Sequence, residues 1–234
     1  MDVIGLLPRL HLLRFPVGQA YLWRDDDALT LIDAGTIGAG RAIADAVRAL
    51  GHAPGDVRRI VLTHFHEDHV GGAGEFAALS GAQVLAHPLD APFVRGELQG
   101  PPPRFEEWEL PIHAEAARQL PEGTPVPPAE VTGVADGDVL GFGGGARVIH
   151  VPGHTDGSIA LFLPDERVLF TGDTVARSPV DATVIPGVFN LDRPRLLASV
   201  ARLAALDAEV ACFGHGDAVV GDAATALRKA AGLA

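Results

Sequence analysis

Three histidines and an aspartate occur within residues 64–69, in the order His-x-His-x-Asp-His. The apolar run Ile60-Val61-Leu62 precedes this motif, and Gly71 and Gly72 follow it. Imidazole and carboxylate groups together form the ligand set that suits zinc and similar divalent ions. The alternative is a solvated polar loop whose histidines cluster by chance. The spacing favours a metal cluster at the end of a buried strand.

Three further stretches downstream each place a glycine next to a candidate ligand. His154 lies in Pro152-Gly153-His154-Thr155, Asp173 in Thr171-Gly172-Asp173-Thr174, and His215 in Phe213-Gly214-His215-Gly216. With the first motif, this series resembles the metallo-beta-lactamase-fold metallo-hydrolase superfamily, which includes small dinuclear zinc hydrolases related to glyoxalase II and lactonases. The resemblance extends from Leu31-Ile32-Asp33-Ala34-Gly35 to His215. Its motifs are specific for the fold and weak for the substrate.

The resemblance implies both a fold and a set of metal ligands. The fold would be α/β, a four-layer αββα sandwich of two mixed sheets with helices outside. The first metal would be held by His64, His66 and His154, the second by Asp68, His69 and His215, and Asp173 would bridge the two. Seven ligands exceed what one tetrahedral zinc needs, so their number argues for two metals. Two Zn²⁺ ions per chain are expected, with Mn²⁺ or Fe²⁺ as alternatives.

The same resemblance implies a hydrolytic reaction. Two ions about 3.5–4 Å apart can share a hydroxide and polarise a carbonyl or phosphoryl oxygen. Asp68 would be catalytic as well as a ligand, because it would orient that hydroxide and return a proton to the leaving group. The expected substrate is a small, neutral or weakly polar ester, lactone or thioester.

Departures from the patterns of known subfamilies narrow the reaction. Beta-lactamases of this fold place Cys or Ser where Asp173 stands. Glyoxalase II enzymes carry a helical substrate domain after the last ligand, whereas only residues 216–234 follow His215 here. Acyl-homoserine lactonases often have a Tyr three residues beyond the bridging Asp, a position occupied by Ala176. The closest group is the small metallo-hydrolases without a settled substrate.

Two other functions remain open. One is an iron-dependent oxidoreductase of the persulfide dioxygenase type, which shares the fold but uses one iron held by two His and one Asp; the intact second ligand set argues against it. The other is a metal-binding scaffold without turnover. Metal analysis and turnover assays distinguish these functions from a hydrolase.

Composition limits the class and the partners. The 234-residue chain is 47% hydrophobic, which suits a single domain over residues 1–234 with a sizeable core. No apolar run approaches the roughly 20 residues that span a bilayer, and Met1-Asp2-Val3-Ile4 lacks the basic start of a secretory signal. The single cysteine, Cys212, cannot form an internal disulfide, and its apolar neighbours indicate a buried thiol. We expect a cytoplasmic protein without a membrane partner.

The formal net charge is −12. Nucleic acid is therefore disfavoured as a partner, because binding to its phosphates relies on clustered positive charge. Nucleases of the superfamily are poor candidates for the same reason. A small-molecule substrate is the expected partner.

The elements before the motif predict how it is positioned. Residues 2–7, 10–15, 19–23 and 28–32 read as strands, followed by a helix over 40–50 and a strand over 58–62. The strand at 28–32, the helix and the strand over 58–62 follow one another in an order that predicts a right-handed parallel crossover. Asp33 ends the strand before the helix, where a carboxylate is costly unless paired. It either caps the following segment or holds a ligand histidine from behind, and the resemblance favours the second role.

Residues 89–128 break this regular alternation. Prolines punctuate the segment on both sides of a helical stretch over 113–120. Such long segments in compact domains are usually lids, binding loops or interfaces. A disordered surface excursion is the alternative, but Phe93, Phe105 and Trp108 are too apolar to favour it. We expect a substrate-lining wall or the arm of a homodimer.

Regular elements are expected on both sides of that segment. Strands are predicted at 83–86, 130–134, 138–140, 146–151, 158–163, 167–170 and 209–213, and helices over 74–79, 194–206 and 222–231. Gly143-Gly144-Gly145 joins two strands, whereas a phosphate loop would open a helix and carry Lys and Ser/Thr. Every expected ligand thus lies just past a strand. His87 also ends a strand, but it matches no ligand position and is expected to be structural or to lie at the rim of the site.

Overall fold

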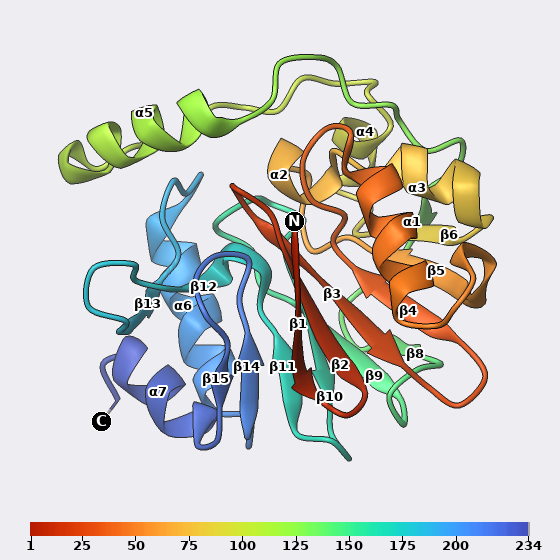
Figure 1. Ribbon diagram of the computed structural model, residues 1–234. Coiled ribbons are helices and arrows are strands. Elements are labelled where there is room, and N and C mark those ends of the chain that lie inside the picture. Colours follow the sequence, from red (N-terminus) through yellow and green to blue (C-terminus); the bar gives the residue numbers. More distant parts are fainter. Residues whose placement is uncertain (234) are drawn as a thin grey trace. The chain divides into compact units, whose positions relative to one another are not determined.

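The computed structural model describes residues 1–233 (Figure 1). The chain forms two compact units. The first unit contains residues 1–100 and 115–134, and the second contains residues 101–114 and those from 135 onward. Each unit is built on one large mixed sheet with helices. The predicted α/β class with two mixed sheets is confirmed. The single domain over residues 1–234 stays a prediction.

The sheet of the first unit has seven strands that follow the order of the chain. Its strands are β1 (Asp2–Leu7), β2 (Leu10–Arg14), β3 (Gln19–Arg24), β4 (Leu29–Ile32), β5 (Val57–Val61), β6 (Gln83–Ala86) and β7 (Thr132–Gly133). β1 to β4 pair antiparallel, whereas β4 to β7 pair in parallel. Parallel neighbours need a crossover connection, and α1 (Ala39–Ala49) supplies it between β4 and β5, as predicted.

Two helices cover one face of this sheet. α1 and α3 (Ala73–Ser80) lie side by side (Figure 1). Ile43 and Val47 of α1, four residues apart and so on one helix face, are fully buried, as is Phe76 of α3. They share a core with strand residues that include Leu22, Leu31 and Ile60. Shorter helical turns are η1 (Pro54–Asp56), α2 (Glu67–Val70) and α4 (Ala91–Val94).

The sheet of the second unit has six strands in the order β15-β14-β11-β10-β9-β8. Its strands are β8 (Val139–Leu140), β9 (Ala146–His150), β10 (Ile159–Leu163), β11 (Val168–Phe170), β14 (Val210–Cys212) and β15 (Val219–Val220). Only the β11 and β14 pair among these is parallel. A separate hairpin is formed by β12 (Val175–Arg177) and β13 (Val184–Pro186). The expected ligands His154, Asp173 and His215 follow β9, β11 and β14.

Helix α6 (Arg193–Ala204) begins one residue before the predicted start at 194 and ends two residues before the predicted end at 206. The Asp192 side chain caps it by accepting the backbone N–H of Arg195, and Pro194 occupies the first turn. Helix α7 (Ala223–Ala230) packs beside α6 (Figure 1). The buried apolar side chains are Leu196, Val200 and Leu203 of α6 and Leu227 of α7.

Cys212 is fully buried in β14, and this burial raises the pKa of its thiol. The prediction of a buried thiol is confirmed. Within residues 1–233, no helix is long and apolar enough to cross a membrane.

The segment over 89–128 contains α4, η2 (Glu107–Glu109) and α5 (Leu110–Gln119). α5 is the expected helix, and it begins three residues earlier than predicted. Two aromatic side chains before α5 differ in burial. Phe105 is partly buried, whereas Trp108 is exposed. Leu110 and Ile112 of α5 are also exposed. Its assignment as a substrate-lining wall or an interface stays a prediction.

Some boundaries and small elements differ from the sequence predictions. The strand expected at 130–134 is reduced to β7, a two-residue bridge beside β6. The hairpin of β12 and β13 and the short β15 were not predicted, because each strand has only two or three residues and no measurable alternation. The metal motif itself continues into α2, so Asp68 and His69 lie on a helical turn.

Replacing Phe76 by alanine should lower the free energy of unfolding by about 3–5 kcal/mol, because the missing ring leaves a cavity in the first unit's core. Chemical denaturation followed by circular dichroism measures this change. Leu79→Ala alters the exposed side of the same helix and serves as the control. It should change stability by less than about 0.5 kcal/mol. Equal losses in the two variants would contradict the packing of α3.

Candidate metal centre

Four of the expected ligands lie together in the first unit. His64 follows β5 and Thr63, His66 is the N-cap of α2, and Asp68 and His69 lie within α2. The imidazole centroids of His64 and His66 are 4.8 Å apart, and those of His64 and His69 are 4.1 Å apart. Asp68 Oδ2 is 3.5 Å from His69 Nε2. Ligand atoms of neighbouring members lie within 4.8 Å of one another, which is close enough to share an ion.

The Asp33 carboxylate orients this group from behind. Asp33 Oδ1 accepts the backbone N–H of Thr63 at 2.7 Å, and Oδ2 accepts the Thr63 hydroxyl at 2.8 Å. Oδ2 also lies 2.9 Å from His69 Nδ1. A carboxylate can only accept, so His69 carries its proton on Nδ1 and presents Nε2 as the ligand atom. The predicted contact between Asp33 and a ligand histidine is present. A capping role is not needed to explain why this carboxylate is buried.

The Thr63 hydroxyl orients the His64 ring in a similar way. The Thr63 hydroxyl has one proton, and it donates that proton to Asp33. It therefore accepts at its other contact, 3.0 Å from His64 Nδ1. His64 then carries its proton on Nδ1 and also presents Nε2. One buried carboxylate and one hydroxyl thus set the tautomers of two histidines.

The two glycines after the motif allow a close backbone approach. A Cβ added to Gly71 would clash with the backbone of Thr36 and Ile37, and one added to Gly72 would clash with Ala34 O. These atoms belong to the loop that leaves β4 just after Asp33. The glycines therefore let α2 pack against that loop, which keeps His69 within reach of Asp33.

Two neighbours of the motif were not singled out from the sequence. Gly18, in the turn between β2 and β3, lies so close to Asp68 that an added Cβ would be 2.6 Å from Asp68 O. The buried Asp90 carboxylate accepts the backbone N–H of Phe65 at 3.1 Å. Phe65 also packs on Phe93, with ring centroids 4.5 Å apart. The beginning of the 89–128 segment therefore supports the motif, although no local sequence signal marks Asp90 as its partner.

The other three expected ligands lie together in the second unit. His154 Nε2 is 3.5 Å from Asp173 Oδ2, and His215 Nε2 is 3.2 Å from the same oxygen. His154 is buried, whereas the side chain of His215 is 38% exposed. Asp173 lies in the turn η3 (Gly172–Thr174) after β11. Its carboxylate is thus placed between the ligand nitrogens of two histidines.

A loop over 187–190 orients His154. His154 Nδ1 lies 3.1 Å from Val188 O and 3.3 Å from Asn190 Oδ1. The Asn190 amide donates to Gly187 O at 2.7 Å, which turns its oxygen toward the histidine. Both neighbours of Nδ1 are acceptors, so the proton lies on Nδ1 and Nε2 is the ligand atom. Sequence reasoning missed Asn190, because a lone amide in an irregular loop has no signature.

The donor sets in both units fit a divalent metal. His64, His69 and His154 each have Nδ1 hydrogen-bonded in a way that presents Nε2, as metal-binding histidines do in proteins. Imidazole nitrogens and carboxylate oxygens without a thiolate suit zinc, manganese or ferrous iron.

Residues 13–215 match the family described as the Metallo-beta-lactamase superfamily. The chain belongs to this superfamily. The match includes every expected ligand, and the superfamily is one of metal-dependent hydrolases. This metallo-beta-lactamase-fold protein is therefore a hydrolase whose substrate the family alone does not define.

Relatives of the protein agree with that membership. It is 28% identical over 227 residues to a probable metallo-hydrolase, YflN, of Bacillus subtilis, covering 91% of this chain and 85% of the relative. It is 30% identical over 199 residues to a hydroxyacylglutathione hydrolase of Cereibacter sphaeroides, covering 82% of this chain. The alignment spans only 62% of the length of that second relative.

Solved structures support the same fold. The metallo-beta-lactamase family protein TTHA1429 of Thermus thermophilus superposes with a TM-score of 0.69 at 30% identity, covering 97% of this chain and 78% of that one. The metallo-beta-lactamase SMB-1 superposes with a TM-score of 0.70 at 24% identity, covering 92% of this chain and 80% of that one. At that identity the second likeness shows the fold alone.

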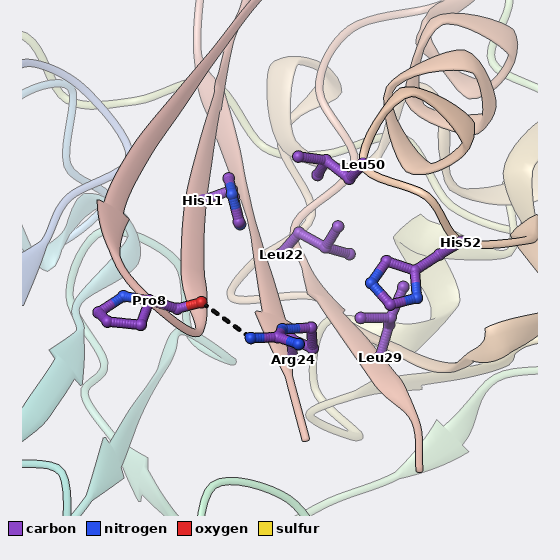
Figure 2. Close-up of a pocket in the computed structure, with 7 residues that line it drawn as sticks. All are labelled: Pro8, His11, Leu22, Arg24, Leu29, Leu50 and His52. Atoms are coloured by element: carbon purple, nitrogen blue, oxygen red, sulfur yellow. Dashed lines mark hydrogen bonds between the residues drawn. The ribbon is translucent and has the colours of Figure 1, made fainter. Parts of the chain in front are cut away.

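Other histidines of the metallo-beta-lactamase-fold protein lie away from the motif. His87 Nδ1 accepts the backbone N–H of Leu89 at 3.3 Å, which is consistent with the structural role expected for it. His11 and His52 line a separate cavity of about 170 Å³ in the first unit (Figure 2). Arg24 also lines it and donates to Pro8 O at 3.2 Å. The pKa of His11 is lowered, first by burial and then by the nearby Arg24 and His52.

The Asp33→Asn variant should bind zinc about 10–100-fold more weakly. The asparagine amide nitrogen only donates, so it cannot replace either of the oxygens that accept from Thr63 and His69, and the tautomer that presents Nε2 is no longer favoured. Competition with a chromophoric chelator measures the affinity, with circular dichroism to verify folding. Asp45→Asn, on the exposed side of α1, is the control and should keep the parental affinity. Parental affinity in Asp33→Asn would contradict this arrangement.

His11 should titrate below its usual pKa of 6.5. Because the folded protein then binds the proton more weakly than the unfolded chain, His11 should reduce stability as pH falls below about 6.5. An NMR titration of the imidazole gives the pKa directly. Arg24→Gln should raise it toward 6.5, whereas Arg41→Gln, near the start of α1, should not. A His11 pKa at or above 6.5 in the parent would show that its environment is not the one described.

Proposed function

We propose that the protein is a dinuclear metal-dependent hydrolase of an ester, lactone or thioester, with zinc as the expected metal and Mn²⁺ or Fe²⁺ as alternatives. The observation that carries the proposal is the position of Asp173 Oδ2, within 3.5 Å of Nε2 of both His154 and His215. A carboxylate in that position is suited to serve two cations, one for each histidine. Membership of a metal-dependent hydrolase superfamily supports the same interpretation.

The ligands would divide between two ions. We assign His64, His66 and His154 to the first, Asp68, His69 and His215 to the second, and Asp173 to both. Bound metals of this kind lower the pKa of a water molecule to near 7 and polarise the carbonyl oxygen of a substrate. The chain's own residues would do the rest: Asp33 and Thr63 hold two imidazoles in the ligating tautomer, and Asn190 and Val188 hold a third.

Asp68 is the residue we assign to proton transfer. Its carboxylate is partly buried, 3.5 Å from His69 Nε2 and beside Gly18. The absence of a side chain at Gly18 leaves the space that the Asp68 carboxylate and backbone occupy. Asp68 would orient the attacking water by accepting its hydrogen bond, and then return the proton to the leaving oxygen or sulfur.

The proposal extends to substrate, partners and location. Residues 89–128 would line the substrate pocket or form the arm of a homodimer. The substrate would be small and neutral or weakly polar, and a membrane would not be a partner. The net charge of −12 argues against nucleic acid as a partner. The expected location is the cytoplasm.

Turnover on a defined panel tests the reaction class. Zinc- and manganese-loaded protein would be assayed on lactones, thioesters, simple esters and phosphodiesters. We expect hydrolysis of at least one of the first three, lost on chelation and restored by metal. Oxidation of a persulfide by the iron-loaded protein, without hydrolysis of any panel member, would overturn the proposal in favour of an oxidoreductase. Tight metal binding without any turnover would identify a scaffold.

Asp173→Asn should lose most of its kcat and at least one bound metal. Asparagine keeps the shape and one acceptor oxygen, but it lacks the negative charge and the second oxygen that two cations would need. KM should change much less than kcat. Elemental analysis and steady-state kinetics measure the two effects together.

Asp181→Asn is the matched control for that variant. Asp181 closes an exposed turn by accepting the N–H of Thr183, so it tests what loss of a turn carboxylate does by itself. It should leave metal content and kcat unchanged. Two metals per chain and full activity in Asp173→Asn would refute the bridging role.

A further inference from the structure

The loop over 187–190 contacts two of the expected ligands in the second unit. Gly187 lies so close to Asp173 that an added Cβ would clash with Asp173 O, and Gly187 N donates to Thr174 O at 3.0 Å. Val188 O and Asn190 Oδ1 both lie on the Nδ1 side of His154. The path of this loop therefore determines where two acceptors meet the His154 ring.

That path includes an unfavourable backbone conformation. Phe189 has a φ of 58°, in the left-handed region that a bulky L-residue rarely adopts. Val188 and Asn190 are its direct neighbours, so relaxation of Phe189 to an ordinary conformation would turn both acceptors away from His154. Such a conformation persists only where surrounding contacts hold it.

Residues 104–113 provide those contacts. The Glu109 carboxylate, 1% exposed, accepts the backbone N–H of Phe189 at 3.2 Å through Oε1 and that of Glu106 at 2.9 Å through Oε2. Arg104 N donates to Asn190 O at 2.9 Å. The Phe189 ring contacts Phe105 and His113, with centroids 6.0 and 5.2 Å away.

The hydrogen bonds of the Glu109 carboxylate indicate a role beyond packing. Burying a carboxylate is unfavourable unless it is hydrogen-bonded, and both of its oxygens are used on backbone N–H groups. Oε2 accepts the N–H of Glu106 and so stabilises the 3₁₀ turn η2, to which Glu109 itself belongs. The other oxygen reaches 80 residues along the chain to the strained Phe189.

We propose that Glu109 is a positioning residue for His154: it fixes the left-handed Phe189, which presents Val188 O and Asn190 Oδ1 to His154 Nδ1. This inference rests on the proposed function, because it treats His154 as a metal ligand. It also assigns a second purpose to the segment over 89–128, whose α5 begins directly after Glu109. That segment would then support a ligand, in addition to the substrate-lining or interface role proposed for it.

Zinc affinity, measured by chelator competition on the full-length protein, tests the proposal independently of turnover. Glu109→Ala should weaken affinity about tenfold or more, the range found when a group that orients a metal ligand is removed. Glu109→Gln keeps an oxygen for the Phe189 N–H and should retain most of the affinity, even if its η2 turn is loosened. Glu107→Ala changes the exposed neighbour in the same turn and should bind zinc as the parent does.

A double-mutant cycle with Asn190→Ala identifies the route. If Glu109 acts through the loop, Glu109→Ala should add little to the loss already caused by Asn190→Ala. Parental zinc affinity in Glu109→Ala, with only a lower Tm, would overturn the proposal and leave Glu109 a packing residue. So would fully additive losses, or a Glu109→Gln variant as weak as Glu109→Ala.

The two proposals fail in different ways. If the parent hydrolyses nothing on the substrate panel while Glu109→Ala still weakens zinc binding, the proposed hydrolase function fails and the positioning role stands. If turnover is found and zinc affinity does not respond to Glu109, the reverse holds. If Glu109→Ala does not fold, a folded Glu109→Gln variant that binds zinc tenfold more weakly than the parent overturns the positioning role.

Discussion

The hydrogen bonds of one carboxylate, Asp33, are the interaction on which the histidine motif depends. The parallel pairing of β4 and β5 brings Asp33 N to within 2.9 Å of Val61 O, so the two strand ends leave the sheet together. Asp33 then accepts from Thr63 twice and faces His69 Nδ1. The parallel pair exists only because α1 crosses over between its strands and buries one face against the sheet. The packing of α1 therefore contributes, through the β4–β5 pair and Asp33, to the choice of the His69 tautomer.

In both units, glycines allow segments that carry expected ligands to approach other elements closely. In the first unit, Gly71 and Gly72 let α2 approach the loop after β4. In the second unit, Gly153 precedes His154 with a φ of 135° and lies against the backbone of Leu196 in the first turn of α6. Asp192 N, at the cap of that helix, donates to Gly153 O at 2.9 Å. Gly71, Gly72 and Gly153 thus each remove a side chain where two backbones touch, which explains why these glycines accompany the histidine motifs in the sequence.

Residues whose role depends on local spacing could be predicted, and those whose role depends on distant contacts could not. The histidine motif, the strands before each ligand and the helix crossover follow from periodicity and from short-range patterns. Asp90, Glu109 and Asn190 do not, because each is a single polar residue in an irregular segment. Their partners lie 25, 80 and 36 residues away along the chain. Asp33 is the exception, since a carboxylate at the tip of an apolar strand is unusual enough to require a partner.

His69 of the first unit and His154 of the second are oriented by different chemistry. In the first, the acceptor at His69 Nδ1 is a carboxylate, which raises the basicity of the ring and strengthens Nε2 as a ligand. In the second, the acceptors at His154 Nδ1 are a carbonyl and an amide oxygen, which fix the tautomer without adding charge. A neutral acceptor needs a rigid backbone to hold it in place, and the strained loop at Phe189 together with Glu109 provides that rigidity.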